Sequence, residues 1–395
     1  MLSISLKNLF VIVSLVLATF SAAIASENTQ DSSKKETYNP VPEIMHHISD
    51  SHEWHFWGEG ENSVTLALPI IIFTNSHPER KKYLTELPKS FMTRFVNHFT
   101  TLWNFGKLHF FMSSAFNHDN YGHNVVVNNG SSFIKIHDKI YVLDHGQEIA
   151  IFDEQHHVSN ATSPTDFSIT KNVASMFVAL VLLLFSFGIS GFKAKKNKSA
   201  PSGLLSFLEP LVLFVRDDIV KPNIGKNYQK YLPYLLTLFF FILMNNLVGL
   251  LPGSANVTGN IAITLVLSFI TLLVTNISGN KSYWGHIFNP PGVPLALMPI
   301  MIPIEIVGIF TKPFALMIRL FANISAGHII ILSLISLIFM AQSGLGDVAA
   351  WSLSPVAVLF VLFMDLIEVL VAFLQAYIFT LLTSLFIGLA TVDHH

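Results

Sequence analysis

The chain has 395 residues, of which 51% are hydrophobic and only 12% are charged. Soluble domains carry about twice that charged fraction, so the composition excludes an ordinary soluble protein and favours one embedded in a lipid bilayer. The formal net charge of -2 gives no reason to expect a nucleic-acid partner, and none is predicted. The chain contains no cysteine, which excludes disulfides, thiol catalysis and thiolate metal sites.

The first 25 residues have the composition of an export signal peptide. Lys7 supplies the positive charge, residues 9–20 form a short apolar core, and Ala23-Ile24-Ala25 fits the small-x-small cleavage pattern. An uncleaved membrane anchor is the alternative, but the apolar run is short for a membrane span. Residues 1–25 are therefore predicted to be a signal peptide.

Residues 26–165 are polar and rich in histidine, asparagine and aspartate. Alternating or β-branched runs predict strands over residues 63–73, 108–113 and 132–143, with turns at residues 129–130 and 145–146. We expect a β-rich domain in the periplasm. Most of the 17 histidines lie in this region, and zinc or copper binding is one interpretation of them. Because no spacing matches a metal-binding motif, no metal site is predicted.

Residues 166–395 are predicted to form the membrane domain. Long uncharged runs predict membrane helices over residues 172–192, 231–251, 257–278, 295–340 and 355–392. Apolar residues at helical spacing within residues 203–219 lie beside charged ones, which predicts an amphipathic helix on the membrane surface. A lysine cluster at residues 193–198 places that end of the first helix in the cytoplasm. The N-terminal domain is then periplasmic and the C-terminus cytoplasmic.

The segment 295–340 is too long for one ordinary span. As a single helix it would measure about 69 Å, against a hydrocarbon core of about 30 Å. It holds either two spans or one steeply tilted helix, and no turn signal near its centre supports two. We predict one long helix, bent at Pro299, Pro303 and Pro313, that forms a tilted hairpin with the last helix. The predicted fold class is membrane all-α, with five membrane helices and an N-terminal β-rich extramembrane domain.

Ionisable residues inside the predicted membrane helices are concentrated in the last two. These residues are Glu305, Lys312, Arg319, His328, Asp365 and Glu368. Each is costly in hydrocarbon, so such groups usually face protein or water and mark a pathway. The alternative is that these residues only form structural ion pairs between the two helices. Such pairing would explain the presence of one arginine and one glutamate, but it does not readily explain six ionisable groups spread along two helices.

The polar residues of the fourth predicted helix divide between two faces. Glu305, Lys312 and Arg319 are spaced by seven residues, which keeps them on one stripe of an α-helix. Asn323 lies near that stripe, whereas His328 is turned to the opposite face, about 13 Å along the axis from Arg319. One helix thus presents acid–base groups towards both ends, with a permanent cation between them.

The last predicted helix carries a polar face formed by Asp365, Glu368 and Gln375. Glu368 is a natural partner for His328, and burial and pairing move the pKa values of both residue types into the working range. Arg319 cannot lose its proton, so it is able to block a proton but not to relay one. The chemistry favours proton transfer along the two helices.

The sequence around these residues resembles subunit a of F-type ATP synthases. The similarity covers residues 165–395. It rests on RLFANISAGH at residues 319–328, EIVGIFTKP at residues 305–313, Glu368 with LQAYIF at residues 374–379, and MNNLVGLLP at residues 244–252. The N-terminal domain departs from the usual pattern and is similar to extended subunits of Bacteroidota-like bacteria, which implies a bacterial inner membrane.

The resemblance implies a stator subunit that leads protons through two half-channels to a rotating ring of c subunits. Arg319 matches the arginine that separates the half-channels and faces the ring. His328 and Glu368 match the pair that lines the half-channel from the outside. Glu305 matches a carboxylate of the cytoplasmic half-channel.

Asn323 and Gln375 match polar residues near the arginine of that family. Lys312 and Asp365 are added as further candidates, and Asp365 matches no family position. The expected partners are the c-ring, the b subunits of the peripheral stalk, protons and the lipid bilayer. We expect no cofactor and no catalytic residue in this chain, because it has no phosphate-binding glycine loop.

Two other functions use the same features. A stand-alone transporter or channel would use the same charges, but such proteins often contain an internal repeat, and we find none between the halves. A membrane-anchored periplasmic binding module would make the β-rich domain the functional part. The choice between proton and sodium would lie largely in the partner ring.

Overall fold

The computed structural model describes residues 38–57, 64–74, 107–116, 125–128, 131–136, 139–143, 161–196, 203–251, 254–289, 294 and 297–391. The predicted signal peptide and the turns expected at residues 129–130 and 145–146 lie outside these ranges. The chain forms two compact units. The larger unit comprises Ser49–Phe321 and Phe373–His395, and the smaller comprises Met1–Ile48 and Ala322–Ala372.

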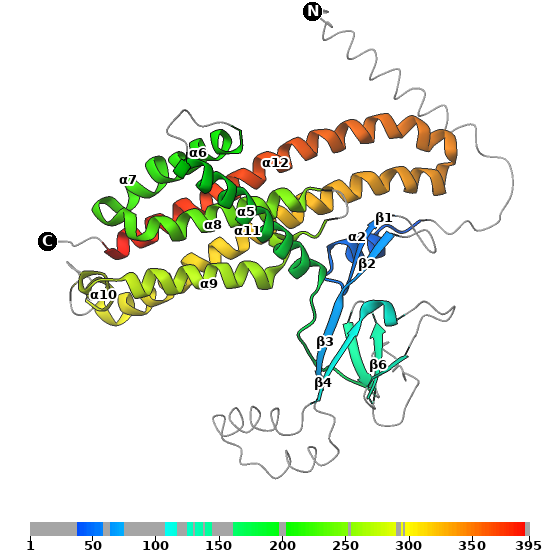
Figure 1. Cartoon of the computed structure of the whole chain (residues 1–395), viewed down its shortest axis with the longest axis horizontal. Helices are drawn as coiled ribbons and strands as arrows, with labels where there is room; N and C mark the ends of the chain where they lie inside the picture. Colours follow the sequence, from blue (N-terminus) through cyan, green and yellow to red (C-terminus); the bar gives the residue numbers. More distant parts are fainter. Residues whose placement is uncertain are drawn as a thin grey trace, which may run out of the picture. The chain divides into compact units, whose positions relative to one another are not determined.

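Five helical segments of the described chain are long and apolar enough to cross a membrane (Figure 1). They are α5 (Lys171–Lys196), the run from α6 to α8 (Leu204–Gly249), α9 (Ile261–Ser278), α11 (Met298–Leu345) and α12 (Asp347–Thr391). The prediction of a membrane all-α fold with five helices and a strand-containing N-terminal region is confirmed. The long segment is one unbroken helix, α11, although Pro303 and Pro313 lie inside it. Membrane helices tolerate proline because neighbouring groups satisfy the freed carbonyls.

The last two helices meet at a tight turn in the smaller unit. Gly346 has a φ of 86°, a conformation that glycine adopts without steric cost. The Gln342 side-chain amide donates to the Asp347 carboxylate across the turn at 3.1 Å. The sequence pattern predicts that the last helix starts at Pro355, but α12 begins at Asp347. The reason is that an acidic residue is favourable in a first helical turn, so residues 347–354 form the first turns of α12.

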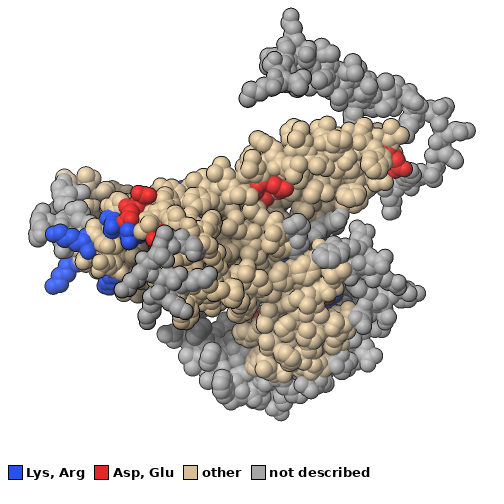
Figure 2. Space-filling view, turned by 45° about the horizontal axis from the view of Figure 1, so that its top comes forward, with Lys and Arg blue, Asp and Glu red and all other residues tan. Residues whose placement is uncertain are grey.

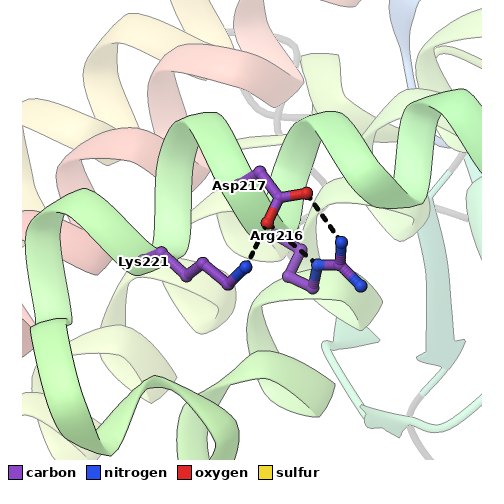
Figure 3. Close-up of polar contacts among 3 residues, drawn as sticks. All are labelled: Arg216, Asp217 and Lys221. Atoms are coloured by element: carbon purple, nitrogen blue, oxygen red, sulfur yellow. Dashed lines mark hydrogen bonds and ion pairs between the residues drawn. The ribbon is translucent and has the colours of Figure 1, made fainter.

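The segment before α8 is helical but contains two irregularities. α6 (Leu204–Phe214) passes through a π-helical segment, η3 (Val215–Val220), into α7 (Lys221–Ile224), and a 3-10 turn, η4 (Gly225–Asn227), leads to α8 (Tyr228–Gly249). Asp217 accepts hydrogen bonds from both Arg216 and Lys221 on this surface (Figure 3). The predicted surface helix is therefore helical and extends to Ile224. Its place at the membrane surface stays a prediction.

The end of α7 packs against the C-terminal part of α12 within the larger unit. A Cβ atom at Gly388 would lie 2.1 Å from the backbone oxygen of Asn223, so the two backbones touch at this point. The Asn223 amide donates to the Ile219 carbonyl at 2.7 Å and to the Ser384 hydroxyl at 3.0 Å. This contact fixes the surface segment to the last helix.

The remaining helices of the larger unit are short. η5 (Val257–Gly259) precedes α9, and α10 (Lys281–Phe288) follows it. Asn260 and Asn280 cap α9 and α10, since their side-chain oxygens accept from backbone N–H groups of the first helical turn at 2.9 Å. In the smaller unit, α2 (Val41–Ile48) follows Tyr38, whose N–H donates to the Ser343 hydroxyl of α11 at 3.2 Å.

The strands within the described N-terminal residues form three small antiparallel sheets. The first pairs β1 (Glu53–Trp57) with β2 (Val64–Ala67), and the second has the order β4 (Lys107–Met112), β3 (Pro69–Thr74), β9 (Thr165–Asp166). The third has the order β5 (Val125–Asn128), β6 (Ser131–Ile136), β7 (Lys139–Leu143), β8 (Ala161–Thr162). A 3-10 turn, η2 (Ser113–Ala115), follows β4. The core between the second and third sheets contains Ile70, Ile72, Phe133 and Val142.

The strand predicted over residues 132–143 is two strands, β6 and β7. Phe133 lies opposite Val142, and Ile136 lies opposite Lys139 at the end of the hairpin. The prediction of a single strand was wrong: β-branched residues lie on both sides of the polar residues 137–139, and no glycine or proline there marks a turn.

Asp50 joins the strand domain to the membrane helices inside the larger unit. One of its carboxylate oxygens accepts from the Asn172 backbone N–H at the start of α5, and the other accepts from the Asn260 side chain at the start of α9, both at 3.2 Å. The Lys171 N–H also donates to the Ser51 carbonyl at 3.0 Å. The strand domain is thus held at the ends of two membrane helices.

The nearby ion pair between His52 and Asp166 gives this junction a predicted pH dependence. His52 is buried, and its Nε2 lies 2.7 Å from the Asp166 carboxylate. Burial raises the pKa of Asp166, but hydrogen bonds from His52 and Ser168 outweigh burial and hold that pKa below its usual value. A carboxyl whose pKa is depressed by folding stabilises the fold above its unfolded pKa, and this stabilisation is lost as pH falls through the folded pKa.

We therefore expect Asp166→Asn to weaken the strand domain by about 1 kcal/mol at neutral pH. The difference from the parent chain should shrink as the pH falls below about 4, where the unfolded carboxyl also takes up a proton. Hydrogen exchange of β3 and β9 in the intact chain measures this. A difference that is equally large at pH 3 and pH 7 would mean that the carboxylate charge is not involved.

Candidate functional site

The structure carries Glu305, Lys312 and Arg319 on a single continuous helix, α11. Seven residues correspond to about 10 Å of helix rise, so the three groups are spaced along one side of α11 over about 21 Å. Glu305 is half-buried, whereas Lys312 and Arg319 are exposed. The unbroken helix therefore keeps the stripe that the sequence spacing predicts.

Arg319 lies on an apolar, exposed surface of α11. Its neighbours Phe314 and Ile318 on the helix are 56% and 43% exposed. Among the described residues, no acidic side chain forms an ion pair with Arg319. A guanidinium in the hydrocarbon region is costly unless it meets water, protein or an opposite charge. This surface is therefore suited to contact a partner that brings a carboxylate.

Glu368 lies inside the smaller unit, between α12 and α11. It is only 7% exposed, and a Cβ atom at Gly327 would lie 3.1 Å from its Oε1. The absence of a side chain at Gly327 makes room for this carboxyl group on the facing helix. His328 is the next residue of α11 and is half-buried, while Asp365 is exposed. The structure thus brings Glu368 close to Gly327, and the pairing of Glu368 with His328 stays a prediction.

The two candidate amides have different surroundings. Gln375 is 3% exposed and lies on the part of α12 that belongs to the larger unit. Asn323 is exposed on α11, one helical turn beyond Arg319. Asn323 is therefore an exposed residue of the smaller unit, whereas Gln375 belongs to the interior of the larger unit.

Glu305 and Lys312 meet residues that the sequence pattern did not single out. Lys312 Nζ lies 5.7 Å from the centre of the Phe386 ring on α12. Tyr283 on α10 has a raised pKa because it is partly buried and because the negative charge of Glu305 acts on its hydroxyl. The hydropathy pattern predicts no helix between the membrane helices at residues 257–278 and 295–340. The Asn280 cap before an aromatic run was the one local sign of α10.

Comparison with known proteins places this arrangement in a family. The family described as ATP synthase A chain matches residues 173–388, and a domain family of unknown function, DUF8433, matches residues 43–79 and 101–167. ATP synthase subunit a of Chloroherpeton thalassium is 48% identical over 236 residues, which cover 58% of this chain and 69% of that protein. ATP synthase subunit a 2 of Chlorobaculum tepidum is 49% identical over 253 residues, 62% of this chain and 70% of that protein. Subunit a of Myxococcus xanthus is 44% identical over 238 residues, 58% of this chain and 75% of that protein.

The fold and the charged residues of α11 and α12 define a multi-pass membrane protein with ionisable groups along its last two helices. The family match and the relatives then make the particular assignment: the chain belongs to the ATP synthase subunit a family, the proton-translocating component of the membrane sector. Membership implies a place beside the c-ring in that sector. The ATP synthase A chain match begins after the strand domain, for which the comparisons give no function.

Proposed function

We propose that this chain is the stator of a rotary ATP synthase and provides two half-channels that end at the c-ring, with Arg319 as the group that separates them. The observation that carries the proposal is the exposed position of Arg319 on an apolar helix surface. A permanent cation there attracts the carboxylate of a ring subunit and stabilises its charged form. It cannot accept a proton, so no proton crosses between the half-channels without being carried by the ring.

The outer half-channel of this proposal uses His328 and Glu368. Support comes from the close approach of Glu368 to Gly327, next to His328, in a buried part of the smaller unit. An acid and an imidazole at the same level of two adjacent helices are groups that exchange protons near neutral pH. Gln375 and Asn323 supply polar groups near the arginine, and Glu305 belongs to the opposite half-channel.

The orientation proposed for the chain places α7 and α10 at the cytoplasmic end, with the strand domain and the N-terminus in the periplasm. Figure 2 shows Lys and Arg side chains gathered at one end of the visible face. Lys226, Lys230 and Lys281 are exposed beside α7, α8 and α10. An excess of lysine and arginine is typical of cytoplasmic loops. The proposal includes a bacterial inner membrane, a cleaved signal peptide and the b subunits of the peripheral stalk as further partners.

Proton flux in liposomes distinguishes this function from a stand-alone transporter. We expect the purified chain alone to give no flux above empty liposomes under an imposed pH gradient. The complete membrane sector, reconstituted at the same density, should conduct protons, because the path runs through the acids of the ring. Flux through the chain alone at the rate of the complete sector would favour the transporter instead.

A further inference from the structure

A small cavity lies between α9, α10, α11 and α12, entirely within the larger unit. It offers about 20 Å³ of space for the centre of a water molecule, which is enough for one water. Its polar lining comes from Thr271, Thr275, Asn276, Tyr283 and Lys312. The apolar part of the wall includes Ile309 and Phe386. The wall is mainly apolar, and the polar side chains that reach it would give a single water its hydrogen-bond partners.

One lining group needs a partner that the described residues do not provide. The Thr275 hydroxyl is buried and has no hydrogen-bond partner among them. Other hydroxyls on α9 bond back to the helix: Thr264 donates to the Asn260 and Ile261 carbonyls, and Thr271 donates to the Leu267 carbonyl. Since buried polar groups without a protein partner usually bind ordered water, Thr275 marks a water position in the cavity.

Tyr283 forms the wall of the cavity on the α10 side. Its hydroxyl donates to the Asn276 side-chain oxygen at 3.0 Å, which joins α10 to α9. Asn280 anchors the same helix to α12, because its N–H donates to the Ala390 carbonyl at 3.0 Å. Gly279 leaves room for the ring, and a Cβ there would lie 2.6 Å from Tyr283 Cδ1. The position of the tyrosine is thus set by three elements.

The cavity also lies next to a candidate proton-path residue. Ile309 of its wall follows Glu305 by one turn of α11, and the charge of Glu305 is felt at the Tyr283 hydroxyl. Lys312 lies about one helical turn beyond Ile309 and lines the same cavity. Its Nζ lies 5.7 Å from the centre of the Phe386 ring. Glu305 itself does not line the cavity, but it lies one helical turn from Ile309 of the cavity wall.

We propose that this cavity holds the water that connects Glu305 with the cytoplasm, that Thr275 binds that water, and that the Tyr283–Asn276 pair keeps the space open. The proposal rests on the proposed function and adds a water site and two positioning residues on α9 and α10. Protons pass along the water by exchange of hydrogen bonds, and no residue of the cavity changes its covalent state.

The natural absence of cysteine from this chain allows a direct test. Thr275→Cys introduces a thiol into the cavity, and Ag⁺ is small enough to follow water to it. We expect Ag⁺, added to the cytoplasmic side of inverted vesicles with the whole complex, to reduce ATP-driven proton pumping several-fold more than in the parent. Thr264→Cys is the matched control, because Thr264 is buried on the same helix but does not line the cavity. Thr271→Cys, at another lining position of α9 outside the Tyr283–Asn276 pair, replaces Thr275→Cys if the latter does not assemble.

A second pair of variants tests the tyrosine. Gly279→Ala displaces the Tyr283 ring, whereas Gly285→Ala on the same short helix meets nothing within 4 Å. In the Thr275→Cys background, Gly279→Ala should slow the Ag⁺ reaction several-fold and Gly285→Ala should not. A merely structural role for Tyr283 would change the amount of complex but not the Ag⁺ rate. An assembled, pumping Thr275→Cys complex that resists Ag⁺ would overturn the water site and leave the proposed function intact, since that function is tested separately at Arg319.

Discussion

An Arg319→Ala complex is expected to assemble but to lose ATP-driven proton pumping completely. Arg319 is exposed, so its removal leaves no cavity and breaks no packing inside the chain. What it removes is the permanent positive charge that favours the ionised form of a ring carboxyl and separates the two half-channels. Without that charge, nothing favours the ionised form of the ring carboxyl beside the stator, and nothing keeps the two half-channels apart.

Arg216→Ala is the matched control for this prediction. Arg216 is a partly exposed arginine of the same chain, but it pairs with Asp217 on the surface formed by η3 and α7. Exposed ion pairs contribute about 0–1 kcal/mol to stability, so this variant should pump at the parent rate. Equal loss of pumping in both variants would show that any missing arginine disturbs the complex and that Arg319 has no special role.

A Gly388→Ala chain is expected to fail at the earlier step of folding and assembly. The added methyl group would lie 2.1 Å from the Asn223 oxygen and 3.0 Å from its carbonyl carbon, both of them backbone atoms that cannot rotate away. Overpacking commonly costs about 1–3 kcal/mol, and a backbone clash belongs at or above the top of that range. We expect α12 to separate from α7 and little of the chain to remain in purified membranes.

The amount of chain in membranes and the thermal stability of the purified complex check this prediction. Gly188→Ala on α5 is the control, because a Cβ there meets nothing within 4 Å and glycine-to-alanine changes favour a helix. Parent-like amounts and stability of the Gly388→Ala complex would show that α7 can move away from α12 without consequence.

The sequence was sufficient for those features that depend on regular spacing. The hydropathy runs predict five membrane helices, and the spacing of Glu305, Lys312 and Arg319 predicts one stripe, because both follow from the geometry of a continuous helix. The resemblance to the family added the roles of the site residues, and these roles stay predictions. Pro355 misled the prediction of the start of α12, since membrane helices also tolerate a proline in their interior, where Pro355 lies.

Contacts between distant residues were not accessible from the sequence. The approach of Gly388 to Asn223 depends on two helices far apart in the chain. Glycine is frequent in membrane helices, so its presence in an apolar run does not by itself mark a close approach. The Tyr283–Asn276 bond depends on a reversal of the chain at Gly279, which the hydropathy pattern does not anticipate. The water cavity follows from these contacts, so no pattern of residue types could have located it.

Whether Arg319 separates the two half-channels is decided by ATP-driven acidification of inverted membrane vesicles that contain the Arg319→Ala complex, with the content of assembled complex measured in the same vesicles. We expect a parent-like content of complex and acidification no greater than in vesicles without it. Acidification at the parent rate by an assembled Arg319→Ala complex would contradict the assignment of this arginine as the separator of the two half-channels.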